Sequence, residues 1–426
     1  MQTKGRTWRK RQIKSVKTTS LAHKQEYIAL FQWAKQNGVF FHKMKPAIFP
    51  GTGRGLMATK QINAGDLLIS VPSKLLVTEE VLRNSYFDGI NSTKALEFST
   101  IELLCLFLIL ERSLGKQSFW SAYISMLPLD YNMPAYFKHH ELKHTPDFFA
   151  EHGWSQVKSI RKCYSSLKKF LLDFNDKTKS IQLTFDDVCW AWNAVNTRCV
   201  YMIGKARFKH SPQKDNMSCS LAPLLDLLNH SCNVQVTAGF SETGKCYQIL
   251  TKTKFKKGDQ VFINYGPHSN RKLLIEYGFI LPYNCHNSVK VHPTLVYEVV
   301  SNHYGDIAKR KFDVITKYCL EDTYYCSPNG LSWSLETALK ILSLNDTKLV
   351  QKSFHINNLQ LSTENEHLVS EFSKEILKSI LVKYDKDIAR IWLCTDGKDG
   401  LSERMQQLVM LLEQEMNTVQ SALNTF

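Results

Sequence analysis

The strand-like segments of this chain fall into two groups that lie far apart in the sequence, with helical sequence between them. Residues 56–71 contain two short β-like runs around an Asn-Ala-Gly-Asp turn, and residues 234–266 contain three more runs separated by polar turns. Residues 95–195 carry helical periodicity, and helical patterns return from about residue 290. This order of strands, helices, strands and helices predicts an α+β fold with a helical insert and an all-α C-terminal domain.

Apolar residues recur at helical spacing in several segments, and capping residues mark some of their ends. Gly38 ends the first segment, and Gly278 is placed to end a short helix that follows Ser269. Pro223 is a favourable first-turn residue for another short helix. The spacing predicts helices over residues 23–37, 96–113, 147–174, 185–196, 335–345, 363–383 and 401–423.

Positive charge is concentrated at the start of the chain. The 426 residues, enough for two or three domains, carry a formal net charge of +15. The first 17 residues contain seven basic side chains and no acidic one. Such a run is typical of a solvated, disordered tail, which we expect over residues 1–20, although a nuclear-localisation or nucleic-acid-contacting arm has the same composition.

The eleven cysteines limit the kinds of site and compartment. Their number is odd and no two form a Cys-x-x-Cys pair, which argues against a disulfide framework and against a clustered zinc site. We therefore expect no metal and a reducing compartment. The N-terminus does not resemble a secretory signal, and the longest apolar run, near residues 103–110, is too short to span a bilayer. These features favour a cytoplasmic and nuclear protein without a membrane partner.

A glycine-rich segment, Gly51-Thr52-Gly53-Arg54-Gly55, precedes the first group of strands. Glycines at this density let a backbone turn tightly and approach a ligand closely. The spacing is not that of a dinucleotide-binding fingerprint, the segment leads into strands, and the Lys-Ser/Thr ending of a P-loop is missing. Taken alone, the segment is explained equally well by an ordinary turn.

Two further segments carry polar and aromatic side chains next to predicted strands. Asn229 and His230 follow a short apolar helix, where they can present polar groups to a flat heterocycle or serve as ordinary loop residues. Tyr265 ends a predicted strand, and Tyr277 lies on the last turn of the following helix and points back toward the helix start. The two phenols are predicted to converge on one place; the alternative is that both are core aromatics with satisfied hydroxyls.

The chain resembles the SET-domain family in segments that occur in the family's order: Gly53-Arg54-Gly55, Asp226-Leu227-Leu228-Asn229-His230-Ser231, and Ile263-Asn264-Tyr265-Gly266 with Glu276-Tyr277-Gly278-Phe279. The helical insert and the helical C-terminal region are similar to the branch typified by the Rubisco large-subunit lysine methyltransferase. The resemblance covers the chain from about residue 24. It implies a SET fold of short β-sheets with a threaded, pseudoknot-like loop. The implied domains are a SET domain at 21–285, with its helical insert at about 76–195, and a helical substrate-binding domain at 286–426.

The resemblance also implies that S-adenosylmethionine is the cofactor. In the family, the glycine segment holds the methionine part, an arginine at the end of the insert lies near the carboxylate, and the Asn-His segment holds the adenosine. The positions that match these cofactor-binding roles are Thr52, Gly53, Arg54, Arg198, Asp226, Asn229, His230 and Tyr265.

Tyr265 matches the family's catalytic tyrosine, and Tyr277 matches a second tyrosine that lines the lysine channel. Methyl transfer from a sulfonium is an in-line displacement, so the enzyme must above all align the reacting atoms. The lysine must arrive as a neutral amine, although its unperturbed pKa is about 10.4. A narrow aromatic channel lowers that pKa by desolvation, and two tyrosines suit such a channel.

The implied function is that of a protein-lysine N-methyltransferase that acts as a monomer. Its expected partners are a protein substrate, including histone tails (H3 or H4) or nucleosomes as well as non-histone proteins. The alternatives are a catalytically weak SET scaffold, a protein-histidine methyltransferase, and a nucleic-acid-binding protein. Retention of both tyrosines together with Asn229 and His230 favours an enzyme, and Tyr277 favours lysine over histidine. No helix-turn-helix, zinc-finger or RNP-type motif is visible, so no sequence-specific nucleic-acid binding is expected.

Overall fold

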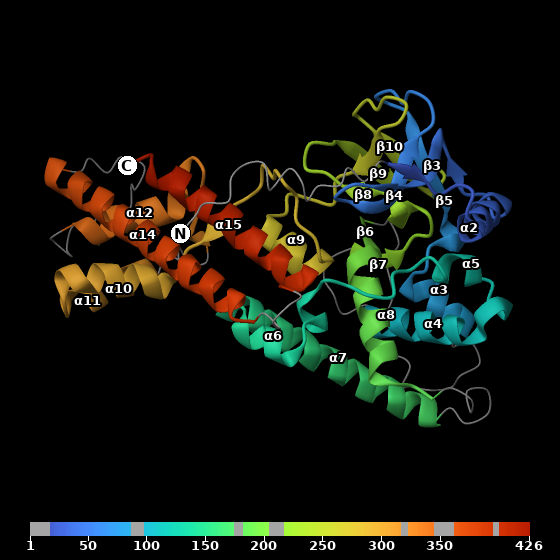
Figure 1. Ribbon diagram of the computed structural model, residues 1–426, viewed down its shortest axis with the longest axis horizontal. Coiled ribbons are helices and arrows are strands. Elements are labelled where there is room, and N and C mark those ends of the chain that lie inside the picture. Colours follow the sequence, from blue (N-terminus) through green and yellow to red (C-terminus); the bar gives the residue numbers. More distant parts are fainter. Residues whose placement is uncertain are drawn as a thin grey trace. The chain divides into compact units, whose positions relative to one another are not determined.

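The computed structural model contains two compact units built from segments that alternate along the chain (Figure 1). The first unit contains the residues up to Tyr131 together with Trp154–Pro267, and the second contains Asn132–Gly153 together with His268–Phe426. No described helix is both long enough and apolar enough to cross a bilayer. The structure describes residues 18–86, 98–173, 182–203, 217–316, 323–344, 362–394 and 400–426.

A five-stranded sheet in the first unit brings the glycine segment next to the Asn-His segment and the tyrosine segment. β3 and β4 form a hairpin, β4 pairs with β11, and β11 pairs in parallel with β8 at the sheet's end. Strands from both predicted groups therefore share one sheet, although more than 150 residues separate them along the chain. The order is β1 (Thr19–Ser20), β3 (Met44–Phe49), β4 (Gly53–Ala58), β11 (Gln260–Ile263) and β8 (Asn229–His230).

A four-stranded sheet and a two-stranded sheet complete the β-structure of the first unit. In the larger one, β5 pairs with β10 so that Ile69 faces Ile249, and both side chains are buried. The smaller sheet consists of β6 (Cys199–Ile203) and β7 (Met217–Leu221). The strands of the larger sheet, in order, are β2 (Phe40–Phe41), β5 (Leu67–Pro72), β10 (Cys246–Thr251) and β9 (Val236–Phe240).

The helical insert of the first unit is built around α4, which packs against α8. A capping box between Ser99 and Glu102 starts α4, and the apolar side chains from Leu103 to Ile109 are all buried. Another capping box, between Thr184 and Asp187, starts α8. The helices of the first unit, including α2 before the insert, are α2 (Gln25–Gln36), α3 (Glu79–Tyr86), α4 (Thr100–Leu114), α5 (Ser121–Ile124), α7 (Asp147–Asp173, whose first residues belong to the second unit) and α8 (Phe185–Arg198).

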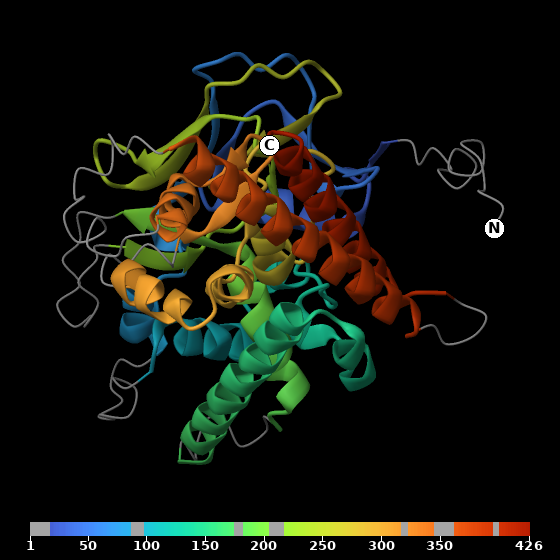
Figure 2. The same cartoon turned by 90° about the vertical axis from the view of Figure 1, so that its left-hand side faces the viewer.

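The second unit is mostly helical and has its own hydrophobic core. The two longest C-terminal helices, α14 and α15, pack side by side (Figures 1 and 2). A small sheet of β12 (Val289–Lys290), β13 (Tyr325–Ser327) and β14 (Gly330–Leu331), which the helical patterns did not predict, packs against α15. The helices are α6 (His139–His144), α9 (Asn270–Tyr277), α10 (Pro293–Tyr304), α11 (Ile307–Thr316), α12 (Trp333–Ser343), α14 (Thr363–Trp392) and α15 (Glu403–Leu423).

The two units follow different boundaries from the predicted domains. The predicted division after residue 285 cuts through the second unit, because α9 packs with α15 and residues 132–153 of the predicted insert also pack there. At the other end, Thr19 and Ser20 pair with β3, so these two residues of the predicted tail belong to a sheet. The remainder of the predicted tail, up to residue 17, lies outside the described residues.

Candidate active site

The glycine segment forms the turn of the β3–β4 hairpin, and two amide side chains tie it down. Gly51 and Gly53 have φ of 81° and 69°, in the left-handed region that favours glycine. The Asn229 Nδ2 atom donates to the carbonyl oxygen of Arg54 at 2.9 Å and to that of Thr52 at 3.4 Å. The Thr52 hydroxyl donates to Gln260 Oε1 at 2.7 Å. The hairpin is thereby fixed to both β8 and β11.

We predict that Gly55→Ala disrupts this attachment. Gly55 has no left-handed φ, but a Cβ atom there would lie 2.6 Å from Gln260 Nε2 and 2.9 Å from Asn229 Nδ2. Both amides must move, which we expect to cost about 1–3 kcal/mol of stability. Thermal unfolding and calorimetric cofactor binding measure the two effects. Gly239→Ala is the control, because a Cβ there meets nothing within 4 Å, and its unfolding temperature and cofactor affinity should be unchanged. Equal losses in the two variants would contradict the steric explanation.

Arg198 and Asp226 form a buried ion pair at the end of α8. The Arg198 Nη1 atom lies 3.1 Å from Asp226 Oδ2, and the two side chains are 17% and 2% exposed. The same nitrogen donates to the Asp226 backbone carbonyl at 3.0 Å, and the Tyr123 hydroxyl donates to Asp226 Oδ2 at 3.1 Å. Three elements of the first unit, α5, α8 and the one-turn 3₁₀ helix Leu225–Leu227, therefore meet at this carboxylate.

Burial and charge act in opposite directions on this pair. Burial raises the pKa of the Asp226 carboxyl, and the Arg198 guanidinium opposes that shift. Burial lowers the pKa of the Arg198 guanidinium. The adjacent Asp226 carboxylate outweighs this effect and raises that pKa above its ordinary value. We describe the pair as charged, because a guanidinium does not lose its proton in proteins and a neutral Asp226 would leave that cation uncompensated. Burial, and next the charge of Asp226, also raise the pKa of Tyr123.

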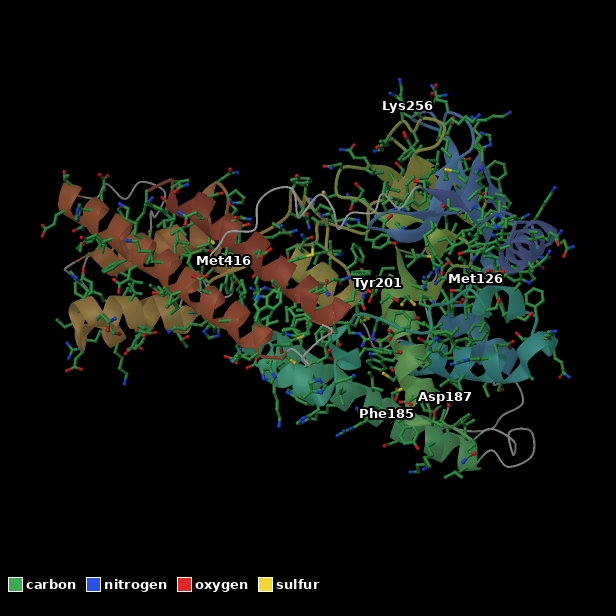
Figure 3. The ribbon with its side chains drawn as sticks, in the orientation of Figure 1. Met126, Phe185, Asp187, Tyr201, Lys256 and Met416 are labelled. Carbon is green, nitrogen blue, oxygen red and sulfur yellow. The ribbon has the colours of Figure 1, made fainter. Side chains whose placement is uncertain are left out.

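Arg198 Nε and Gln260 Nε2 are buried nitrogen donors of this region that have no hydrogen-bond acceptor within the described part of the chain. A buried donor without a partner costs free energy, so such atoms are expected to meet a ligand or water. Arg54 lies on the adjacent hairpin, where its Nη1 atom donates to the Met126 carbonyl at 2.9 Å (Figure 3). The region therefore offers donors suited to an anionic or acceptor-rich ligand.

His230 and Tyr265 are held against each other at the ends of the two parallel strands. The Tyr265 backbone N–H donates to His230 Nδ1 at 3.0 Å, and the two rings stack with their centroids 5.1 Å apart. Because Nδ1 accepts, the neutral imidazole carries its proton on Nε2. The Tyr265 hydroxyl donates to the Leu228 carbonyl at 2.7 Å. A phenol that has donated its only hydrogen can form further hydrogen bonds only as an acceptor.

All of the predicted cofactor-binding residues belong to the first unit. Thr52, Gly53 and Arg54 lie on the hairpin, Asn229 links that hairpin to β8, and His230 is the second residue of β8. Tyr265 follows two residues after β11, and Arg198 pairs with Asp226. One local expectation needs correction. Asn229 and His230 do not lie in a loop past a regular helix: they form a two-residue strand after a single 3₁₀ turn, because the backbone of β11 is available for parallel pairing.

Tyr277 belongs to the second unit, on the last turn of α9. As predicted, Gly278 ends this helix in the left-handed conformation, with φ of 77°. A Cβ at that position would meet the backbone of Asn132 at 3.3 Å, which is a second reason for glycine. The ring of His268 stacks on that of Tyr277, with centroids 6.0 Å apart. The predicted convergence of Tyr277 with Tyr265 stays a prediction.

Sequence reasoning missed the side chains and carbonyl groups that hold the predicted residues in place. Gln260 anchors Thr52, Tyr123 supports Asp226, and the Leu228 carbonyl accepts from Tyr265. Gln260 and Tyr123 lie outside the quoted motif segments, and Leu228, which lies inside one, contributes only a backbone group. Asn264 had a clearer signal, because it stands directly before Tyr265; its side chain accepts from Gly266 N and donates to the Val234 carbonyl.

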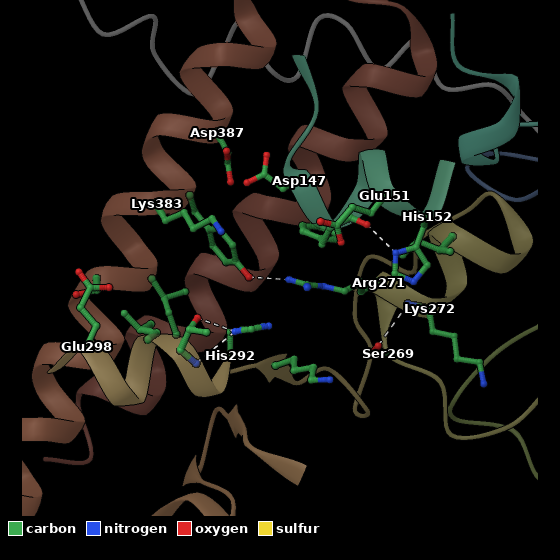
Figure 4. A pocket seen from close by; sticks show the side chains of 18 of the residues that line it. Asp147, Glu151, His152, Ser269, Arg271, Lys272, His292, Glu298, Lys383 and Asp387 are labelled. Atoms are coloured by element: carbon green, nitrogen blue, oxygen red, sulfur yellow. Dashed lines mark hydrogen bonds between the residues drawn. The ribbon is translucent and has the colours of Figure 1, made fainter. Parts of the chain in front are cut away.

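The second unit contains a cavity of about 870 Å³ that is lined by many charged residues, although most of its wall area is apolar (Figure 4). Arg271 lines this cavity. Its guanidinium donates to Glu415 at 2.8 Å and to the Tyr384 hydroxyl at 2.7 Å. The same group lies 3.8 Å from the centroid of the Phe148 ring. The charged side chains that line the cavity are Asp147, Glu151, Arg271, Lys272, Glu276, Lys290, Glu298, Lys383 and Asp387. Charges of both signs suit a polar peptide surface better than an apolar small molecule.

Comparisons with known proteins agree with this geometry. The SET-domain profile matches residues 53–266. SET domain-containing protein 4 of Homo sapiens is 30% identical over 431 residues, covering 99% of this chain and 97% of that protein. The actin-histidine N-methyltransferase of Gallus gallus is 32% identical over 269 residues, covering 62% of this chain and 44% of that protein. The solved structure of Rubisco LSMT bound to sinefungin and monomethyllysine has a TM-score of 0.63 at 20% identity, covering 94% of this chain and 91% of that one. The predicted resemblance is confirmed: the chain belongs to the SET-domain family of S-adenosylmethionine-dependent methyltransferases.

Proposed function

We propose that this protein transfers a methyl group from S-adenosylmethionine to a lysine side chain of another protein. The observation that carries the proposal is the setting of Tyr265. Its hydroxyl is committed as a donor to the Leu228 carbonyl, and its ring and backbone are fixed by His230. Its remaining hydrogen-bonding capacity is that of an acceptor, which suits the N–H group of a neutral lysine amine.

The residues of the first unit fit the cofactor. When bound, S-adenosylmethionine supplies an electrophilic methyl group on a sulfonium. Arg198, with a buried Nε that lacks an acceptor in the described chain, is suited to its carboxylate. The hairpin of Thr52, Gly53 and Arg54 would hold the methionine part, and Asp226, Asn229 and His230 the adenosine. The Asp226 carboxylate acts through Arg198, whose orientation it fixes.

The chain's own contribution to catalysis is alignment and desolvation. Tyr265 is fixed through its hydroxyl and through its backbone, so little freedom is lost when substrate binds. We propose that Tyr277 lines the other side of the lysine channel. Aromatic walls exclude water, which lowers the pKa of the incoming ammonium and favours the neutral nucleophile. The released proton passes to solvent.

We further propose that the helical second unit binds the substrate protein, with the charged cavity as its contact area. Lys290 and Lys383 are exposed and line this cavity. Lys290→Ala combined with Lys383→Ala should raise KM for an intact protein substrate about tenfold, because two charge-assisted contacts are lost. Steady-state kinetics with the protein and with a short peptide around the target lysine measure this. An unchanged KM for the intact protein, or an equal rise for the peptide, would remove the cavity from substrate binding.

A second candidate reaction is methylation of a protein histidine. It is favoured by the identity of 32% with an actin-histidine N-methyltransferase across 62% of this chain. The two reactions differ at the acceptor: a neutral imidazole is already abundant at pH 7, whereas a lysine amine must first be deprotonated. A channel with a tyrosine at position 277 suits the lysine better.

The test is transfer of labelled methyl groups from S-adenosylmethionine into cell extract, purified histones and nucleosomes, followed by mass spectrometry of the modified residues. Methyllysine supports the proposal, and methylhistidine would replace it with the second candidate. Histones, as well as non-histone proteins, are the proposed substrates, and the nucleus and cytoplasm the proposed locations. Cofactor binding without transfer into any of these samples would instead indicate a catalytically weak scaffold.

A further inference from the structure

Helix α7 of the insert exposes a long basic face that plays no part in the site described above. Between Trp154 and Leu172 the sequence contains five basic residues and no acidic one. On the opposite side of this stretch, Ile160, Leu167 and Phe170 are buried. The exposed face carries the basic residues Lys158, Arg161, Lys162, Lys168 and Lys169.

These five cations are not neutralised by the part of the fold that the structure describes. None of them forms an ion pair with a carboxylate of the described residues. The start of α8 lies nearby, since Phe185 packs against Tyr164, but the neighbouring Asp187 serves its own helix cap (Figure 3). A helix dipole favours cations only in the last turn, and Lys162 lies three turns before the end of α7 at Asp173.

A hollow lies at one end of the same face. It has a volume of about 410 Å³ and is lined by Tyr164, Ser165, Lys168, Lys169 and Leu172. The two lysine side chains beside this hollow provide cationic hydrogen-bond donors of the kind that bind a phosphate group. The Ser165 hydroxyl donates to the Arg161 carbonyl at 3.0 Å. We propose that the α7 face binds the phosphate backbone of nucleic acid without regard to base sequence.

The geometry favours nucleic acid over other acidic partners. The cations extend over the twelve residues 158–169 of the helix, or about 16 Å, a length over which B-DNA presents roughly ten charges. A membrane surface would require apolar side chains beside the basic ones. A protein interface would require an apolar or aromatic centre. Between Trp154 and Leu172 no large apolar side chain of this stretch is exposed. Leu172 alone borders the basic residues Lys168 and Lys169 at the hollow.

Matched lysine substitutions in the full-length protein test the proposal. One variant carries Lys158→Gln, Lys162→Gln, Lys168→Gln and Lys169→Gln. The control carries the same number of Lys→Gln changes at Lys252, Lys254, Lys256 and Lys257, which are exposed on the same unit and remove the same total charge. Binding to a fluorescent DNA duplex of random sequence, and to RNA of equal length, is measured between about 50 and 200 mM salt. Methyl transfer to a short peptide checks that both variants are folded.

The wild-type protein should bind with a log–log salt slope of about −4. The α7 variant should bind at least about tenfold more weakly, with a slope reduced by roughly one for each lysine removed, while the control stays within about twofold of wild type. Preference for DNA or for RNA would identify the source of the phosphates. The proposal is overturned by equal losses in the two variants, by unchanged binding of the α7 variant, or by anionic vesicles or polyglutamate competing as well as DNA does.

Discussion

Tyr265→Phe is expected to lower kcat on the order of 10²-fold or more while leaving the protein folded and able to bind S-adenosylmethionine. The substitution removes one oxygen and keeps the ring that stacks on His230. It also keeps the backbone N–H that donates to His230 Nδ1. The lost oxygen is the proposed acceptor for the substrate amine, and removing one positioned hydrogen-bonding group from an active site typically costs 10²–10³-fold in rate.

Three measurements on this variant separate its effects: kcat for peptide methylation, the Kd for the cofactor, and thermal stability. Tyr247→Phe is the matched control, because it deletes the hydroxyl of another tyrosine in the same unit, on β10. That change should leave kcat within about twofold. Turnover near the wild-type rate in Tyr265→Phe would exclude Tyr265 as a catalytic residue.

Arg198→Met should produce the largest loss of stability among single substitutions at the site. Removing the guanidinium leaves the Asp226 carboxylate, which is 2% exposed, without its counter-ion. Breaking one side of a buried pair in this way costs about 3–5 kcal/mol. For a unit of this size, the midpoint of thermal unfolding should fall by roughly 10 °C. Cofactor affinity should fall as well, because the proposed partner of its carboxylate is lost.

The double variant Arg198→Met with Asp226→Asn tests whether the loss of stability comes from the uncompensated charge. In the double variant no charge is buried, and the amide side chain introduced at position 226 keeps a hydrogen-bond acceptor for the Tyr123 hydroxyl. A large part of the lost stability should therefore return, while the cofactor affinity should not. If the single and double variants unfold at the same temperature, the cost does not come from an uncompensated charge.

The sequence predicted the elements whose signals are local. The apolar spacing of α4, α8 and α15 gave helices at the predicted places, and the Asn-Ala-Gly-Asp turn does separate β4 from β5. Periodicity did not reveal that β4 and β5 join different sheets, since pairing depends on partners about 200 residues away. Within the helical pattern predicted from about residue 290, it gave no bounds for α10 and α11, and it missed the small sheet of the second unit, whose strands are two or three residues long.

The sequence predicted those residues of the candidate site that belong to the motifs shared with the SET-domain family. The glycine hairpin, Asn229, His230 and Tyr265 carry such signals, and they do meet in the first unit. The residues that support them could not be predicted, because their roles arise from contacts between distant segments. Tyr123 reaches Asp226 across 103 positions and Gln260 reaches Thr52 across 208. The Leu228 carbonyl is a backbone group, which no residue pattern identifies.

A crystal structure of the protein with S-adenosylhomocysteine would test the central claim most directly. We predict that the product lies against the glycine hairpin, with its carboxylate on Arg198, its adenosine beside Asn229 and His230, and its sulfur facing Tyr265. Finding the nucleoside bound elsewhere, with none of these residues in contact, would contradict the proposed site and the reaction built on it.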